Sequence, residues 1–189
     1  MAIPLVKQAQ NRIQKYLHEG DIAVDATMGN GFDTLFLACE VSNTGKVYGF
    51  DVQKEALKAT SMQLKKAGFS ANVRLIHDSH EYIANYLGQD KVTGIRCAMF
   101  NLGYLPGSNK NCQTKSKATI IALESVLNYL QSPGIITLVA YTGHEGGLEE
   151  ATAVKAWVNG LNKSDYKVTI EIPKVIKNSP PELIIIEAV

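Results

Sequence analysis

The stretch Ile22-Ala23-Val24-Asp25-Ala26-Thr27-Met28-Gly29-Asn30-Gly31 decides the fold, because it joins a short apolar run to a glycine loop. Residues 32–38 follow with helical spacing. A strand, a glycine turn and a helix in this order start a βαβ unit. Glycine permits positive φ and lets a ligand approach the backbone at a helix N-terminus. The alternative interpretation is that the glycines serve a purely steric role in a tight turn.

The same alternation of short apolar and amphipathic segments continues along the chain. Strands are predicted at residues 22–26, 47–52, 73–76, 95–100, 134–140, 168–172 and 183–186. Helices are predicted at residues 4–17, 32–38, 54–67, 79–87, 115–130 and 148–161. Strands that alternate with helices predict a parallel sheet, and the last two strands, which have no helix between them, are predicted to pair antiparallel. We therefore predict an α/β, Rossmann-like single domain over residues 1–189. Its seven-stranded sheet should be mostly parallel, with a C-terminal antiparallel hairpin and helices on both faces.

Composition and charge exclude several classes of protein. The length of 189 residues suits one domain, and a net charge of +1 does not indicate general affinity for nucleic acid. The cysteines Cys39, Cys97 and Cys112 form no CxxC pair, so neither a zinc site nor a disulfide framework is predicted. The N-terminus has no signal-peptide pattern, and no apolar run approaches the roughly 20 residues of a membrane span. We expect a cytoplasmic protein that contacts neither a metal nor a membrane.

Carboxylates near the glycine loop indicate which ligand it binds. Right-handed crossovers place the loops after the parallel strands at one edge of the sheet, so Asp51 should lie beside Gly31 and accept both hydroxyls of a ribose. A dinucleotide loop requires a third glycine where this chain has Thr34. Asp25 and Asp33 would repel a pyrophosphate but suit an ammonium group. The sequence thus favours S-adenosyl-L-methionine over NAD, with Asp25 either orienting the loop or reaching the ammonium group.

The third strand leads into Asp78-Ser79-His80. A polar side chain at this position commonly reads the edge of an adenine ring in such a fold. The alternative role for Ser79 is to cap the following helix. The alternative for His80 is an ordinary surface histidine.

Two loops provide candidates for binding the acceptor of a methyl group. In Asn101-Leu102-Gly103-Tyr104-Leu105-Pro106-Gly107, the Asn101 amide is suited to hold an amine nitrogen and the Tyr104 ring to stack on a base. The alternatives are that Asn101 braces the turn and Tyr104 packs. Three nearby lysines either meet phosphates or form a solvated helix start, which is the preferred interpretation: Lys110, Lys115 and Lys117.

The loop after the fifth strand is Tyr141-Thr142-Gly143-His144-Glu145-Gly146-Gly147. An ammonium group cannot attack a sulfonium methyl, so methylation of an amine requires removal of a proton. Histidine accepts a proton near neutral pH. We predict that His144, helped by Tyr141, removes this proton; the alternative is that His144 only hydrogen-bonds the loop.

These loops together resemble a small bacterial family that has been labelled rRNA methylases. The resemblance rests on the segment Asp25 to Ala38, on the two loops that begin at Asn101 and Tyr141, and on Pro180-Pro181-Glu182-Leu183, and it covers essentially the whole chain. Members of that family are understood as methyltransferases of the tRNA wobble uridine, which convert 5-aminomethyl-2-thiouridine to its methylaminomethyl form.

The resemblance implies a class I methyltransferase fold and a primary amine as acceptor. It also implies that the anticodon arm of tRNA docks on the catalytic domain itself, with a homodimer as one possible form of the enzyme. The wider group of amino-methyltransferases has two prolines where this chain has Leu102-Gly103, which leaves the clamp on the nitrogen open. The cofactor candidates are Asp25, Thr27, Gly29, Asn30, Gly31, Phe32, Asp33, Asp51, Gln53, Asp78, Ser79 and His80. The acceptor candidates are Asn101, Gly103, Tyr104, Lys110 and Lys115, and the catalytic candidates are His144, Tyr141 and Asn101.

Two other functions fit the same residues. One is methylation of rRNA or of a small amine. The other is a non-enzymatic module that binds S-adenosyl-L-methionine or an NAD-type ligand.

Overall fold

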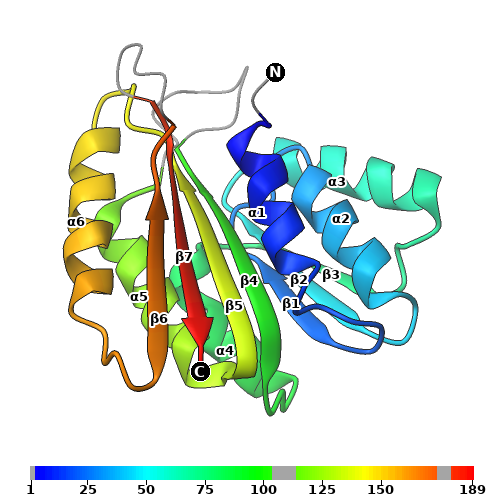
Figure 1. Cartoon of the computed structure of the whole chain (residues 1–189). Helices are drawn as coiled ribbons and strands as arrows, with labels where there is room; N and C mark the ends of the chain where they lie inside the picture. The colour runs from blue at the N-terminus through cyan, green and yellow to red at the C-terminus, as the bar shows by residue number, and fades with distance from the viewer. Residues whose placement is uncertain (1–2, 104–113, 174–179) are drawn as a thin grey trace.

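One seven-stranded sheet organises the computed structural model, which describes residues 3–103, 114–173 and 180–189 (Figure 1). The strands are β1 (Ile22–Asp25), β2 (Lys46–Asp51), β3 (Val73–His77), β4 (Ile95–Leu102), β5 (Leu130–Ala140), β6 (Tyr166–Glu171) and β7 (Glu182–Ala188). Their order is β3-β2-β1-β4-β5-β7-β6, and β7 pairs antiparallel with both of its neighbours. The other pairs are parallel, so the predicted topology is confirmed.

Helices cover both faces of this sheet. They are α1 (Leu5–Ile13), α2 (Phe32–Val41), α3 (Lys54–Ala67), α4 (Ile83–Gln89), α5 (Ser116–Tyr129) and α6 (Gly147–Asn159), with a 3₁₀ helix η1 (His80–Tyr82) before α4. Successive strand residues point to opposite faces. In β1, Ala23 therefore packs in the core under α1, α2 and α3, whereas Val24 packs in the core under α4, α5 and α6.

Element boundaries differ from the prediction most clearly at three places. The first helix ends at Ile13, because Tyr16 donates its backbone N–H to the Ile13 carbonyl in a tighter turn. The helix after Ser79 begins as η1 and becomes α-helical only at Ile83. β5 begins at Leu130, and its pairing with β4 shifts register before the regular ladder starts.

The strand order places the functional loops together. β1 pairs with β2 on one side and with β4 on the other, so the order of the sheet reverses between β1 and β4. In open α/β sheets, ligands bind beyond the carboxyl ends of the strands at such a reversal. The carboxyl ends of β1, β2, β4 and β5 all lie at this edge of the sheet (Figure 1).

Candidate active site

Asp25 organises the loop that follows β1. Its side chain is fully buried and accepts the backbone N–H of Thr27 at 3.2 Å and the hydroxyl of Thr34 at 2.6 Å. Burial, followed by the charge of Asp33, raises the pKa of Asp25 to about 7. Of the two roles that the sequence left open for Asp25, the structure favours orienting the loop.

The two glycines of the loop adopt positive φ. Gly29 has φ of 50° and Gly31, which precedes α2, has φ of 82°. A Cβ atom at Gly31 would lie 2.7 Å from Oγ1 and 2.8 Å from Cα of Thr60 in α3. Both backbone conformation and close approach therefore require glycine at position 31.

Residues of α3 and the end of β2 hold the same loop from other sides. Asp51 accepts the backbone N–H of Gly29 at 3.0 Å and that of Gln53 at 2.9 Å. The Thr60 hydroxyl donates to the Gly29 carbonyl at 3.3 Å. A further loop contact joins Gln63 Nε2 to the Asn30 carbonyl. No local pattern pointed to Thr60 or Gln63, because both lie about 30 residues beyond the loop that they contact.

At the end of β3, the structure separates the three candidates. Asp78 accepts the backbone N–H of Ser79 and, at 2.9 Å, the hydroxyl of Tyr86. Ser79 accepts the backbone N–H of Glu81 at 3.4 Å, which is the capping role. The interpretation of His80 as a surface histidine is wrong: its side chain is buried, with Nδ1 3.2 Å from the Ala26 carbonyl in the loop after β1.

His80 packs against the loop that follows β1. Burial lowers the pKa of its imidazole. Its ring also contacts the edge of Phe100 in β4, with 6.0 Å between ring centroids. It therefore links the ends of β3 and β4 to the loop that follows β1.

Asn101, near the end of β4, is hydrogen-bonded to the loop after β1 and to the start of α2. Its backbone N–H donates to Thr27 Oγ1 at 2.7 Å, and its side-chain Nδ2 donates to Asp33 Oδ2. The other oxygen of Asp33 accepts Nε2 of Gln10 in α1 at 2.8 Å. The sequence did not indicate Gln10, since α1 carries no motif. Burial raises the pKa of Asp33.

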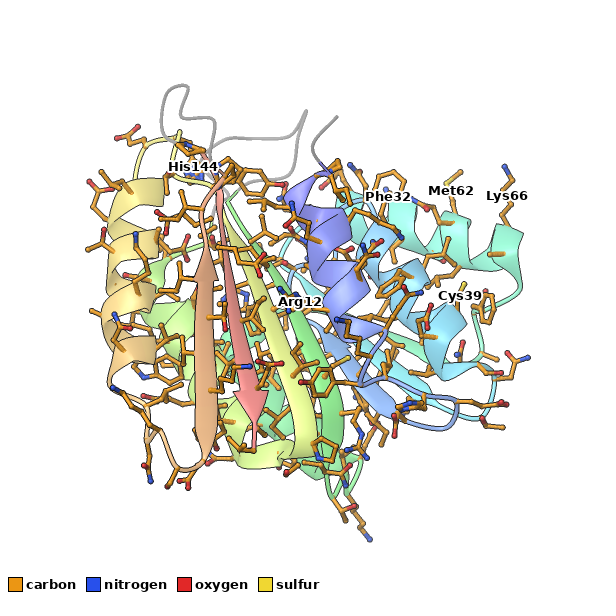
Figure 2. The ribbon with its side chains drawn as sticks, viewed as in Figure 1. Arg12, Phe32, Cys39, Met62, Lys66 and His144 are labelled. Carbon is orange, nitrogen blue, oxygen red and sulfur yellow. The ribbon has the colours of Figure 1, made fainter. Side chains whose placement is uncertain are left out.

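His144 lies at the same edge of the sheet as Phe32, above α6, while Phe32 stands above α2 (Figure 2). A Cβ atom at Gly103 would lie 3.2 Å from Nε2 of His144. A Cβ atom at Gly147 would overlap Nδ1 of His144 and the carbonyl of Tyr141. The imidazole is thus seated between two glycines, one beyond β4 and one at the start of α6.

Tyr141 stands beside this histidine. Its side chain retains 42% of its accessible surface, and the pKa of its phenol is raised by partial burial and by the charge of Asp33. A phenol whose pKa is raised stays protonated near neutral pH, so its hydroxyl can donate a hydrogen bond. Asp33 therefore accepts a hydrogen bond from the Asn101 amide and also contributes to the raised pKa of the Tyr141 phenol.

Hydrogen bonds join Gly103, just beyond β4, to Thr114. Gly103 and Thr114 exchange hydrogen bonds of 2.9 Å, from Gly103 N–H to Thr114 Oγ1 and from Thr114 N–H to the Gly103 carbonyl. The Thr114 hydroxyl donates to the buried Glu150 of α6 at 2.6 Å, and Thr119 of α5 donates to the other oxygen at 2.7 Å. Neither Thr114 nor Glu150 was a candidate from the sequence.

The remaining candidates are dispersed. Phe32 exposes 67% of its surface beside the loop after β1, and Lys115 is exposed at the start of α5. Tyr104 and Lys110 lie outside the described residues. Within the described ranges, no group of three or more His, Cys, Asp or Glu side chains is placed to hold a metal ion, and no helix is long and apolar enough to cross a membrane.

Comparison with known proteins places these features in context. Residues 47–187 match the family model described as “Putative rRNA methylase”. A tRNA (mnm5s2U34)-methyltransferase of Arabidopsis thaliana, chloroplastic, is 38% identical over 161 residues, which are 81% of this chain. The match spans 58% of the length of that relative.

Two solved structures resemble the chain over its full length. A “putative rRNA-methylase” from Clostridium thermocellum is 35% identical with a TM-score of 0.94, and each chain is covered completely. A “putative methyltransferase” from Streptococcus mutans in complex with SAH is also 35% identical, with a TM-score of 0.89 and complete coverage of both chains.

Proposed function

This chain belongs to the family described as “Putative rRNA methylase”, and on that premise we propose that it is an S-adenosylmethionine-dependent N-methyltransferase acting on the aminomethyl group of a tRNA wobble uridine. Its sheet order, with the reversed β7, is that of the class I methyltransferase fold. The Arabidopsis relative supports tRNA as the substrate. The proposal rests mainly on one observation: the His144 imidazole lies against Gly103, and Gly103 is two residues beyond Asn101 in the chain.

The residues around the β1 loop fit a cationic methyl donor. The three carboxyls of Asp25, Asp33 and Asp51 all have raised pKa values, chiefly because they are buried. S-adenosylmethionine carries a sulfonium and an ammonium group, and opposite charge nearby favours ionised carboxylates. When bound, it supplies an electrophilic methyl group to the acceptor. Gly29 and Gly31 leave the backbone of the loop open to close approach.

The acceptor side then has two tasks. Asn101 orients the primary amine, and His144 takes the proton whose loss frees the nitrogen lone pair for attack on the methyl group. Tyr141 acts as a hydrogen-bond donor, since the pKa of its phenol is raised.

The decisive experiment supplies the protein with S-adenosylmethionine and tRNA that carries 5-aminomethyl-2-thiouridine. Mass spectrometry of the nucleosides should reveal the methylaminomethyl form, whereas tRNA without the aminomethyl group should remain unmodified. No product from the aminomethyl tRNA would sink the proposal. The family's description favours rRNA as the second candidate substrate; methylation of rRNA but not of tRNA in the same assay would establish it.

A further inference from the structure

A partly buried chain of hydrogen bonds connects α1 to the acceptor side of the site. Gln10 Nε2 donates to Asp33 Oδ1 at 2.8 Å, and Asn101 Nδ2 donates to Asp33 Oδ2. The three residues belong to α1, α2 and β4, and Asp33 is only 6% exposed. Since both carboxylate oxygens are engaged, Asp33 is fixed between two amides.

This arrangement determines which way the Asn101 amide faces. A carboxylate accepts hydrogen bonds, so the NH2 group of Asn101 must face Asp33 and its carbonyl oxygen must face the other way. Oδ1 of Asn101 is buried and has no hydrogen-bond partner among the described residues. A buried acceptor that is left without a donor is destabilising. A donor is therefore expected at this oxygen, and the N–H groups of a primary amine supply one.

We infer that Gln10 is a positioning residue for the methyl acceptor: by holding Asp33, it fixes the Asn101 amide with its carbonyl oxygen towards the amine. The inference rests on the proposed function and extends it to α1, which precedes the segment matched by the family model. Without Asp33, the Asn101 amide would have no preferred orientation, because its oxygen and its NH2 group are nearly equal in shape.

The competing explanation is that Gln10 only attaches α1 to the rest of the fold. Other contacts already attach this helix. Ala9 and Ile13 are buried in the core, Arg12 pairs with Glu171 at 2.5 Å, and Tyr16 donates to Glu187 at 2.5 Å. Loss of the Gln10 amide should therefore leave α1 in place.

The test replaces Gln10 by Met, which keeps an unbranched side chain with similar helix propensity but removes the donor. Gln14→Met is the matched control, because Gln14 lies one turn further on and donates at 2.8 Å to Glu40 in an exposed contact. In Gln10→Met we expect kcat on aminomethyl tRNA to fall about 10-fold, as for loss of one positioning interaction, with KM for S-adenosylmethionine within twofold. Gln14→Met should match the wild type. Wild-type kcat in Gln10→Met would overturn the inference.

A second readout does not depend on turnover. Hydrogen exchange of the Asn101 side-chain NH2, assigned by its absence in Asn101→Asp, is followed by NMR in the wild type and in both variants. Slow exchange that becomes fast only in Gln10→Met supports the inference, and unchanged exchange overturns it. A wild type that methylates no tRNA overturns the proposed function, and the amide exchange still decides the role of Gln10.

Discussion

The imidazole of His144 lies so close to Gly103 that a Cβ atom there would stand 3.2 Å from Nε2. The contact joins the loops after β4 and β5, which are about 40 residues apart in the chain. Gly103 is also hydrogen-bonded to Thr114, whose hydroxyl donates to Glu150. The position of His144 therefore depends on a glycine backbone that is itself held by α6.

His144→Ala should reduce kcat on aminomethyl tRNA by roughly 10²–10⁴, the usual contribution of a general base. The affinity for S-adenosylmethionine, measured by calorimetry, should stay within twofold, because the cofactor candidates lie on the loops after β1, β2 and β3. His18→Ala is the control, since His18 lies before β1 with a side chain that is 74% exposed. A wild-type kcat in His144→Ala would show that His144 is not the general base and that it only hydrogen-bonds its loop.

Gly147→Ala should displace the His144 ring without removing it. The added Cβ overlaps Nδ1 of His144 and the Tyr141 carbonyl, so the ring or the helix start must shift. A kcat at least about 10-fold below the wild type is expected, since small misplacements of reacting groups are costly. Gly88→Ala in α4 is the control, because the nearest atom to its added Cβ is the Tyr129 hydroxyl oxygen at 3.6 Å. Equal kcat values for the two variants would contradict this seat for His144.

Gly31→Ala should weaken cofactor binding. The new Cβ meets Thr60 at 2.7–2.9 Å, and φ of 82° strains any side chain. Gly68→Ala separates the two effects, because Gly68 has φ of 83° but no described atom lies within 4 Å of an added Cβ. Both variants should lose about 1–2 kcal/mol of stability from backbone strain. Only Gly31→Ala should lose at least about 10-fold in affinity for S-adenosylhomocysteine by calorimetry, as expected where a side chain displaces the loop that the ligand approaches.

The contribution of Asp25 to stability without cofactor should fall as pH rises. Asp25 binds its proton more tightly in the folded protein, with a pKa of about 7, than in the unfolded chain, where it is about 3.9. The stabilisation is fully present below the unfolded pKa and is lost as pH rises through the folded pKa. Thermal unfolding between about pH 5 and 8.5 should show a declining melting temperature, with a shallower decline in Asp25→Asn. Parallel curves for the two proteins would refute this assignment.

Lys115→Ala should raise KM for tRNA without changing kcat if this exposed lysine meets a phosphate. The slope of log(kcat/KM) against log salt should become shallower by about 0.7–0.9, the value for one phosphate contact. Lys163→Ala is the control, because Lys163 is exposed before β6, at the opposite edge of the sheet. An unchanged salt slope in Lys115→Ala would leave Lys115 as a solvated helix start.

Much of the fold was predictable from local patterns. The alternation of apolar and amphipathic segments indicated the number of the strands and their places along the chain, and the absence of a helix before β7 predicted its reversal. The positive φ of Gly29 and Gly31 and the place of Asp51 beside their loop were also predictable, because a strand, a turn and a helix are short-range features. The interpretation of His80 as a surface histidine failed, since no local pattern reveals that α5 packs over η1.

The sequence by itself determined which residues are candidates for the chemistry: a glycine loop between carboxylates, an asparagine after β4 and a histidine after β5. Tertiary structure alone decided how these groups are held. Gln10 reaches Asp33 across 23 residues and Asn101 reaches it across 68. Glu150 likewise holds Thr114 across 36 residues. Such contacts have no periodicity along the chain, because they arise only when the packing of helices on the sheet brings distant segments to one edge.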